Sequence, residues 1–328
     1  MSDPDITDRL ATYFEGKWNQ PVEIAGFKRF HGGAGRETYR FDVASGDRRE
    51  GLVLRRDPPK SIIETDRLPE YRAIEMFHGT DVPVPEPLFL EEGADAFGAP
   101  GFIMREVPDC DAVGAFEADP FGEARAQIGQ DFFGALGAIH SADPASLGLP
   151  VSSAKDRLKH WAGVIAEDSV QPEPVAAAAR RWLLANLPPD PKRACVVHGD
   201  YRRGNFLVRD GRIAAILDWE MVHVGDPLED LAWASDPLWS FGSDYVAATV
   251  PQAEAIRIWE KASGLTCDAH AFRWWQMFAQ YMGLAIWISA AAEIASGRSV
   301  DPVVAWAGLH PYREHNAGLA RALKEAAQ

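Results

Sequence analysis

One short stretch of the sequence gathers residue types that could bind a metal ion and handle phosphate. The segment from Val196 to Glu220 reads VVHGDYRRGNFLVRDGRIAAILDWE and sets Asp200, Asn205 and Asp218 beside β-rich apolar runs. Carboxylate and amide oxygens suit magnesium, which completes its shell with water and phosphate. A carboxylate next to such a centre can accept the proton of an attacking hydroxyl. The stretch therefore indicates a metal–phosphate site.

A tight hairpin would bring two of these side chains together. The pair Asp210-Gly211 between NFLV and IAAIL is typical of a two-residue type I′ turn, whose central positions both need a positive φ. This turn makes Asp218 the diagonal neighbour of Asn205 on one face, roughly 7–8 Å away at the backbone. The alternative is that Asp and Asn only form turns here. The complete pattern H-G-D-x-x-x-x-N, followed by a hairpin and an Asp, favours the functional interpretation.

The same pattern resembles the kinase signature H-R-D-x-x-x-x-N followed by D-F-G. With HGDYRRGN, DWE and GDPLEDLAWA, the sequence is similar to the aminoglycoside phosphotransferase and choline kinase family. It is most similar to the branch whose kinase-like domain is also found joined to acyl-CoA dehydrogenases. The resemblance implies that Asp200 is the catalytic base and that Asn205 and Asp218 hold Mg²⁺. No A-P-E segment follows DWE, which argues against a protein kinase.

The resemblance runs from the glycine turn near His31 to at least Trp239, so it covers most of the chain. It implies an α+β fold of the bilobal protein-kinase-like type, with a small β-rich N-lobe and a larger α-helical C-lobe. It also implies that His198 shapes the catalytic loop and that Asp226 and Asp230 brace this loop by hydrogen bonds.

The predicted secondary structure differs between the two parts of the chain, which agrees with two lobes. Residues 1–107 contain short strand patterns and one helix pattern, LPEYRAIEMFHG, and are expected to form the nucleotide-binding lobe. Residues 108–328 contain several helix patterns and a Trp-rich tail, and are expected to form the catalytic and substrate-binding lobe.

A glycine-rich turn could cover the phosphates of a nucleotide. The segment HGGAGRETYRF supplies Gly32, Gly33 and Gly35, which let backbone N–H groups approach an anion closely. The alternative is a plain hairpin turn. No G-x-x-x-x-G-K-[ST] motif is present, so the segment is not a P-loop.

The remaining nucleotide contacts follow from the resemblance. Arg55 stands where kinases carry a phosphate-binding Lys, and its guanidinium can fork between phosphate and carboxylate. Glu70, on an apolar helix face, is the expected partner of Arg55, and Glu64 is the alternative. Backbone groups between Met104 and Val107 are expected to bind the base of ATP or GTP.

Composition narrows the compartment and the partners. The 328-residue chain has a formal net charge of −15, which disfavours nucleic acid and anionic membranes. Its three cysteines are odd in number and far apart, so neither a disulfide framework nor a zinc site is expected, and the cytoplasm fits best. The N-terminus lacks an apolar signal region. The apolar run 278–295 includes Gln280 and Glu293, which favours a buried helix over a membrane span.

These observations together predict an ATP- and Mg²⁺-dependent phosphotransferase acting on a hydroxyl of a small molecule. The alternative is a catalytically weak or inactive nucleotide-binding regulatory protein on the same fold, because Arg55 replaces the usual Lys. Tryptophans from Trp233 onward could form a cage for a quaternary ammonium, but rings at helical spacing are more often core. A homodimer is compatible with the sequence.

Overall fold

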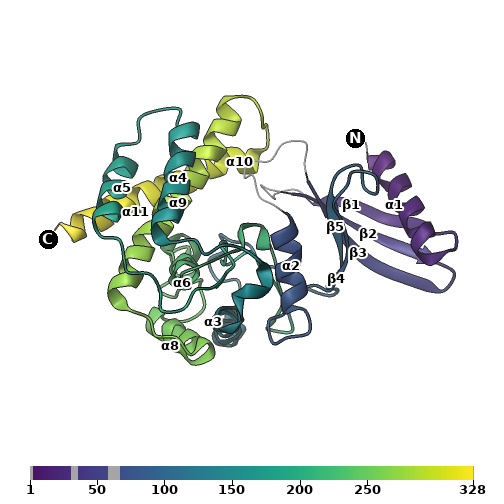
Figure 1. Cartoon of the computed structure of the whole chain (residues 1–328), viewed down its shortest axis with the longest axis horizontal. Helices are drawn as coiled ribbons and strands as arrows, with labels where there is room; N and C mark the ends of the chain where they lie inside the picture. Colours follow the sequence, from purple (N-terminus) through teal and green to yellow (C-terminus); the bar gives the residue numbers. More distant parts are fainter. Residues whose placement is uncertain (1–2, 31–35, 58–66, 328) are drawn as a thin grey trace. The chain divides into compact units, whose positions relative to one another are not determined.

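The computed structural model describes residues 3–30, 36–57 and 67–327. Antiparallel strands dominate the described N-terminal part and helices the C-terminal part (Figure 1). The predicted α+β class is therefore confirmed.

The chain divides into two compact units. The first comprises Met1–Cys110 and Ala214–Glu220, and the second comprises Asp111–Ile213 and Met221–Gln328. The short segment that contains Asp218 thus belongs to the N-terminal unit, although it follows the catalytic-loop sequence in the chain. The predicted boundary near residue 107 stays a prediction.

The first unit is built on a five-stranded antiparallel sheet in the order β1-β2-β3-β5-β4. Strand residues alternate between its two faces. Within β3, Leu52 and Leu54 are fully buried in the hydrophobic core. Arg55 comes one residue after Leu54, so its side chain lies on the opposite face of the sheet. The elements are α1 (Asp3–Trp18), β1 (Glu23–Phe30), β2 (Glu37–Ser45), β3 (Arg48–Arg56), α2 (Arg67–Phe77), β4 (Pro87–Glu91) and β5 (Gly101–Arg105).

Helix α1 covers one face of this sheet (Figure 1). Ile6, Leu10 and Phe14 recur every four residues, which places them on one helix face, and all three are buried against sheet residues such as Phe41. Only one helix was predicted in residues 1–107, so α1 is an additional helix. The spacing of four residues between Ile6, Leu10 and Phe14 indicates this helix in the sequence, although the N-terminus is otherwise acidic.

The second unit is mainly helical. Helix α9 packs against α4, α5, α6, α10 and α11, while α3 packs against α8. Its elements are β6 (Asp111–Ala112), η1 (Gly122–Ala124), α3 (Arg125–Ser141), η2 (Pro144–Leu147), α4 (Ala154–Asp168), α5 (Pro174–Ala185), β7 (Cys195–Val197), β8 (Phe206–Arg209), β9 (Arg212–Ile216, which continues into the first unit), β10 (His223–Gly225), α6 (Leu228–Ala234), α7 (Pro237–Ser240), α8 (Gln252–Ser263), α9 (Ala269–Ala295), α10 (Pro302–Ala307) and α11 (His310–Ala326). A 3₁₀ turn, η3, spans Trp219–Met221 where the chain returns to this unit.

The apolar run predicted as a buried helix lies in α9. By length and composition α9 could cross a membrane, but 67% of its apolar window is buried inside the protein. The central helix of a protein core can be equally long and apolar. Five other helices of the second unit pack against α9. Its apolar side chains are accounted for by packing.

Most of the C-terminal tryptophans are core residues. Five of the seven from Trp233 onward are at most 1% exposed, namely Trp233, Trp239, Trp259, Trp274 and Trp275. Buried indoles of this kind supply packing area and one N–H donor each. A cage built from these five rings is therefore not supported, and the core alternative holds for them.

The predicted hairpin is present. Strands β8 and β9 lie next to each other in a three-stranded sheet, and the connecting residues Asp210 and Gly211 have φ values of 51° and 71°. Both positive values are those that a type I′ turn requires. The Asp-Gly pair therefore sets the turn as predicted.

Close packing of α3 on α8 gives a prediction for stability. A Cβ added to Gly137 would lie 2.4 Å from the Cβ of Ala262, whereas one added to Gly134 meets nothing within 4 Å. We expect Gly137→Ala to lower the free energy of unfolding by about 1–3 kcal/mol through overpacking. Gly134→Ala, the control on the same helix, should raise it by about 0.5–1 kcal/mol. Urea denaturation measures both, and equal effects would contradict the packing argument.

Candidate active site

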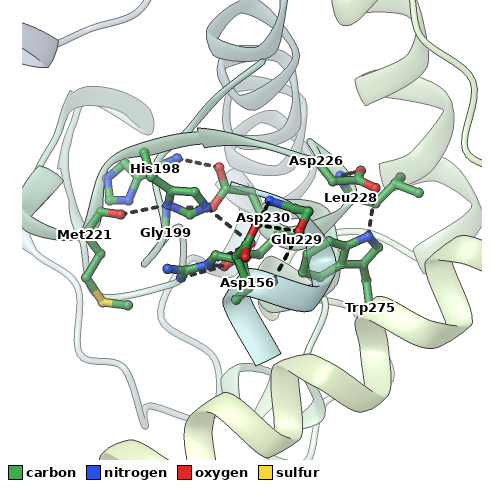
Figure 2. A network of polar contacts seen from close by, with 12 residues as sticks. Asp156, His198, Gly199, Met221, Asp226, Leu228, Glu229, Asp230 and Trp275 are labelled. Carbon is green, nitrogen blue, oxygen red and sulfur yellow. Dashed lines mark hydrogen bonds and ion pairs between the residues drawn. The ribbon is translucent and has the colours of Figure 1, made fainter. Parts of the chain in front are cut away.

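The catalytic loop of the second unit is attached to a buried carboxylate. Asp230 accepts hydrogen bonds from the backbone N–H groups of His198, at 2.7 Å, and Gly199, at 2.9 Å (Figure 2). Its side chain is fully buried and also contacts His140 Nε2 at 3.2 Å. Trp259 donates to His140 Nδ1 at 2.8 Å, so Nε2 carries the hydrogen that points to Asp230. This network confirms the predicted bracing role of Asp230.

The middle residue of H-G-D must be glycine. Gly199 has a φ of +86°, and a Cβ at this position would lie 2.4 Å from the carbonyl oxygen of Met221. Either feature alone disfavours a side chain. The next residue turns back on the loop, because the Asp200 N–H donates to His198 Nδ1 at 3.2 Å. His198 therefore shapes the loop as predicted.

Asp200 is held by three side-chain donors. Trp233 Nε1 donates to Oδ1 at 2.8 Å, and Asn205 Nδ2 donates to Oδ2 at 2.7 Å. Arg202 Nε spans both oxygens, at 3.0 and 3.1 Å. A carboxylate has about four lone-pair directions, and these four contacts use them, with the single Arg202 hydrogen shared between the two oxygens. The carboxylate is fixed in place, and the shared Arg202 hydrogen is the contact that a hydroxyl group would replace.

Asn205 is oriented by its neighbour. Its Nδ2 donates to both the backbone oxygen of Asp200, at 2.9 Å, and the Oδ2 atom of Asp200. Both amide hydrogens thus point toward Asp200, which leaves Oδ1 as the atom that can coordinate a cation. An amide oxygen fits the hard-oxygen preference of magnesium.

Arg202 was not anticipated from the sequence. Its guanidinium lies over the ring of Trp239, 4.9 Å from the ring centroid, while Nε contacts Asp200. A stacked guanidinium keeps one edge for polar contacts. The only signal in the sequence was its position two residues after Asp200, which does not reveal the distant tryptophan.

The first unit contains a second polar group, centred on Arg55. The predicted ion pair with Glu70 is present, with Nε 2.9 Å from Oε1. Arg55 Nη2 also lies 2.8 Å from Asp218 Oδ1 and 3.7 Å from Glu220 Oε2. The Arg55 guanidinium therefore contacts both Glu70 of α2 and Asp218, the predicted metal ligand. The contact with Asp218 was not predicted.

A second arginine supports Glu70. Arg36 Nε lies 3.3 Å from Glu70 Oε2, and Arg36 Nη1 lies 3.1 Å from Asp57 Oδ1. Arg36 and Glu70 are both buried. Buried charges are tolerated when they are paired in this way. Arg36 was not predicted as a site residue, because only the glycines of its segment were singled out.

Burial and charge shift the protonation of this group. Burial raises the pKa of Glu70, while Arg55 and Arg36 oppose the rise. Burial, followed by repulsion from Asp218, raises the pKa of Glu220 to about 8. For Arg55, burial would lower the pKa, but the surrounding carboxylates outweigh it and the pKa is raised. The first unit thus concentrates three acidic groups on one arginine.

Asp218 adopts an uncommon backbone conformation. Its φ of 67° places it in the left-handed region, where non-glycine residues are rare and are often functional. Its side chain is 26% exposed, in contrast to the fully buried Glu70. An exposed carboxylate oxygen suits a metal ion. No cluster of three or more His, Cys, Asp or Glu residues that could hold a metal occurs among the described residues.

Of the predicted nucleotide contacts still to be placed, only Met104 and Val107 are among the described residues. Met104 lies on β5 and pairs with Val53, and Val107 follows that strand. Gly32, Gly33, Gly35 and Glu64 lie outside the described residues.

Asp226 does not brace the catalytic loop, contrary to the prediction. Its carboxylate accepts from the backbone N–H of Leu228, at 2.9 Å, and from Trp275 Nε1, at 2.9 Å (Figure 2). Asp226 therefore fixes the start of α6 to α9. An Asp two residues before a helical N–H commonly binds that donor, which explains the local choice.

The comparison with known families identifies the group. Residues 26–265 match the model of the phosphotransferase enzyme family. The chain belongs to this family. The match covers both the Arg55 group and the Asp200 loop.

Relatives and solved structures agree with this assignment. Acyl-CoA dehydrogenase family member 11 from Rattus norvegicus is 31% identical over 202 residues, which are 57% of this chain but only 25% of that protein. The Mus musculus protein of the same name is 30% identical over 202 residues, with the same coverage of each chain. The chain thus spans about a quarter of the length of these relatives.

The fold is that of phosphotransferases of the kinase-like type. A putative aminoglycoside phosphotransferase from Ralstonia eutropha superposes with a TM-score of 0.76 at 21% identity, covering 95% of this chain and 98% of that one. A choline/ethanolamine kinase family protein from Mesorhizobium loti gives 0.61 at 17% identity, covering 99% and 98%. A thermostable mutant of the aminoglycoside phosphotransferase APH(4)-Ia, solved as a ternary complex with AMP-PNP and hygromycin B, gives a TM-score of 0.62 at 18% identity, covering 95% of this chain and 97% of that one. The predicted bilobal protein-kinase-like fold is confirmed.

A buried ion pair near the loop of this phosphotransferase gives a pH prediction. Glu229 is buried and contacts Arg157 Nη2 at 2.8 Å and His223 Nε2 at 3.2 Å. Burial alone would raise the pKa of Glu229, but Arg157 and His223 lower it to about 2. The pair therefore stabilises the fold above the unfolded-state pKa, and this contribution is lost as the pH falls from about 5 toward 2. We expect Glu229→Gln to be less stable at pH 7 by about 3 kcal/mol.

Urea denaturation between neutral and acidic pH measures this effect. The difference between wild type and Glu229→Gln should shrink as the pH is lowered. Glu254→Gln, which removes an exposed carboxylate 3.6 Å from Arg257, should change stability by less than about 0.5 kcal/mol at every pH. A difference for Glu229→Gln that is independent of pH would contradict the assignment.

Proposed function

We propose that this phosphotransferase transfers the γ-phosphoryl group of ATP to a hydroxyl group of a small molecule, in a Mg²⁺-dependent reaction. The observation that carries the proposal is the geometry of the catalytic loop. Asp200 is fixed by Trp233 and Asn205 and shares one further hydrogen with Arg202, while the orientation of Asn205 leaves its amide oxygen free to bind a cation.

Asp200 acts on the acceptor in this proposal. Its carboxylate accepts a hydrogen bond from the hydroxyl in place of the shared Arg202 hydrogen and orients an oxygen lone pair of the hydroxyl toward the phosphorus. The hydroxyl proton passes to Asp200 as the new O–P bond forms and the bond to the ADP oxygen breaks. The fixed carboxylate needs little reorganisation, which is how positioning lowers the barrier.

The cation would be held by Asn205 Oδ1 and the Asp218 carboxylate, together with phosphate oxygens and water. When bound, Mg²⁺ neutralises charge that develops on the phosphates. Arg55 is paired with Asp218 in this structure, at 2.8 Å. We propose that Arg55 transfers this contact to the nucleotide phosphates while its other edge stays on Glu70.

The rest of the nucleotide site stays as predicted from the resemblance. Gly32, Gly33 and Gly35 would place backbone N–H groups over the phosphates, and backbone groups from Met104 to Val107 would bind the base. The bound form of the APH(4)-Ia structure contains AMP-PNP, which supports ATP as the donor, and GTP is the alternative.

The acceptor is proposed only as a class. The relatives named as acyl-CoA dehydrogenase family members suggest a hydroxyl on an acyl compound or another small metabolite. The solved relatives include one with hygromycin B and a choline/ethanolamine kinase family protein. A screen should therefore include hydroxyacyl thioesters, sugars and amino alcohols. We also propose a cytoplasmic location and allow for a homodimer.

A second candidate function has one observation in its favour. Arg55, in place of the usual Lys, forms an ion pair with the very carboxylate proposed to hold the metal. If that pair persists with nucleotide bound, the protein would be a regulatory nucleotide-binding protein with little or no transfer activity. Magnesium-independent ATP binding, without turnover across the screen, would favour this function.

The role of Asp200 gives the first activity prediction. Asp200→Asn keeps the shape of the side chain but loses the proton acceptor, so we expect kcat to fall about 10²–10⁴-fold with nucleotide affinity unchanged. ADP release in the presence of the acceptor found by screening measures the rate. The matched control is Asp210→Asn at the hairpin turn, because Asn also tolerates a positive φ. Full turnover by Asp200→Asn would exclude Asp200 as the base.

The proposed metal ligand, Asp218, gives the second activity prediction. Asp218→Ala should abolish the increase in ATP affinity that Mg²⁺ produces, as measured by isothermal titration with and without the ion. Asp95→Ala, which removes an exposed carboxylate of the same unit, should leave that increase intact. An unchanged Mg²⁺ effect in Asp218→Ala would argue against its role as a ligand.

A further inference from the structure

A histidine beside the catalytic loop has no role in the reaction proposed above. His223 opens β10, and its backbone partner is Val197, the last residue of β7. Because the two strands run antiparallel, the register carried two residues further brings Met221 opposite Gly199. The side chain of His223 is only 13% exposed. His223 therefore lies where β7 enters the loop that carries Asp200.

Both ring nitrogens of His223 face an oxygen atom. Nδ1 lies 3.0 Å from the backbone oxygen of Met221, and Nε2 lies 3.2 Å from Oε2 of Glu229. A carbonyl and an ionised carboxylate can only accept hydrogen bonds. A neutral imidazole carries one hydrogen and would set a nitrogen lone pair against one of these oxygens. The geometry therefore requires both hydrogens, so the ring is an imidazolium.

The carboxylate of Glu229 holds this imidazolium in place. Its side chain is only 2% exposed, and its Oε1 also accepts from Arg157 Nε, at 3.0 Å, and from Arg157 Nη2, at 2.8 Å. A buried carboxylate between two cations is well compensated. Glu229 comes from α6 and Arg157 from α4, so the ring is tied to two helices of the second unit.

The Met221 carbonyl connects the ring to the catalytic loop. A Cβ added to Gly199 would lie 2.4 Å from this oxygen, so the oxygen occupies the side-chain space of Gly199. The N–H of Gly199 donates to Asp230 Oδ1 at 2.9 Å (Figure 2). Glu229 and Asp230 are consecutive residues of α6. Helix α6 therefore holds Gly199 by two routes, once through its amide and once through the imidazolium.

An ion pair by itself would need only one of the two ring contacts. Nε2 is sufficient for pairing with Glu229, whereas the hydrogen on Nδ1 is used on the carbonyl that lies against Gly199. A hydrogen bond from a charged donor is stronger than one between neutral groups. That carbonyl is consequently held in one orientation and limits the movement of Gly199. Asp200 is the next residue, so its position is restricted as well.

We propose that His223 is a positioning residue for phosphoryl transfer. Its imidazolium holds the Met221 carbonyl against Gly199 and thereby keeps Asp200 in the orientation needed to accept the hydroxyl proton. This role rests on the proposed function and adds to it a residue that acts through the loop.

Two substitutions separate the two contacts of the ring. His223→Asn places an amide N–H near the position of Nδ1, so it keeps a donor for Met221 but cannot reach Glu229. His223→Gln places its amide near the position of Nε2, so it keeps a donor for Glu229 but loses the donor for Met221. We expect kcat to fall about 10–100-fold in His223→Gln and at most about threefold in His223→Asn, because a misplaced catalytic group reacts slowly. ADP release with the acceptor found by screening measures both rates.

Stability should follow the opposite order. His223→Asn loses the contact with the buried Glu229, so its urea midpoint should be lower than that of His223→Gln. A purely structural residue would lose kcat in the order of stability, so the crossed order identifies positioning. His270→Gln, which changes an exposed histidine at the start of α9, is the matched control and should alter neither quantity. A larger loss of kcat in His223→Asn than in His223→Gln, or equal kcat in the two, would overturn the proposal.

Amide hydrogen exchange tests the role without an acceptor. In His223→Gln the amides of Gly199 and Asp200 should exchange at least about tenfold faster than in the wild type, because the loop opens more often. In His223→Asn the rates should stay within about threefold of the wild type. Unchanged exchange in folded His223→Gln would also overturn the proposal. If the wild type phosphorylates no acceptor of the screen, the phosphotransfer proposal fails, while this measurement still decides whether His223 holds the loop.

Discussion

The Asp230 carboxylate is the interaction on which the catalytic loop depends. It is fully buried, and it binds the two successive N–H groups of His198 and Gly199. A buried charge persists only when its hydrogen bonds are complete, so the loop and the carboxylate stabilise each other. Asp200 follows directly after these anchored amides, and its own side chain is then fixed by Trp233. The buried Asp230 therefore determines where the proposed base, Asp200, lies.

The first unit solves a similar problem with arginines. Glu70 is fully buried on α2 and is compensated by Arg55 from β3 and by Arg36. Arg55 shares its charge with Asp218, whose carboxylate is more exposed. Removing Glu70 would leave the buried Arg55 and Arg36 short of a counter-charge in a low-dielectric environment, which costs more than the intact pairs gain. The network therefore holds its members in one arrangement while leaving Asp218 open to exchange partners.

A Trp–His–Asp hydrogen-bond chain occurs twice in the second unit. In both, an indole N–H fixes the imidazole and the imidazole fixes a carboxylate. Asp230 uses its oxygens to hold backbone, whereas Asp236 caps α7 with one oxygen and has no described partner for the other. The difference lies only in what surrounds the carboxylate.

Local chemistry was set by the sequence alone. The Asp210-Gly211 turn, the glycine at position 199 and the apolar face of α2 with Glu70 each depend on neighbouring residues, and the H-G-D-x-x-x-x-N pattern indicated the family. Long-range partners were decided by the tertiary structure. The contact of Arg202 with Trp239 and of Asp226 with Trp275 joins residues 37 and 49 positions apart. A side chain with several possible partners in the sequence meets one of them only when packing brings their elements together, so its role is fixed by the fold.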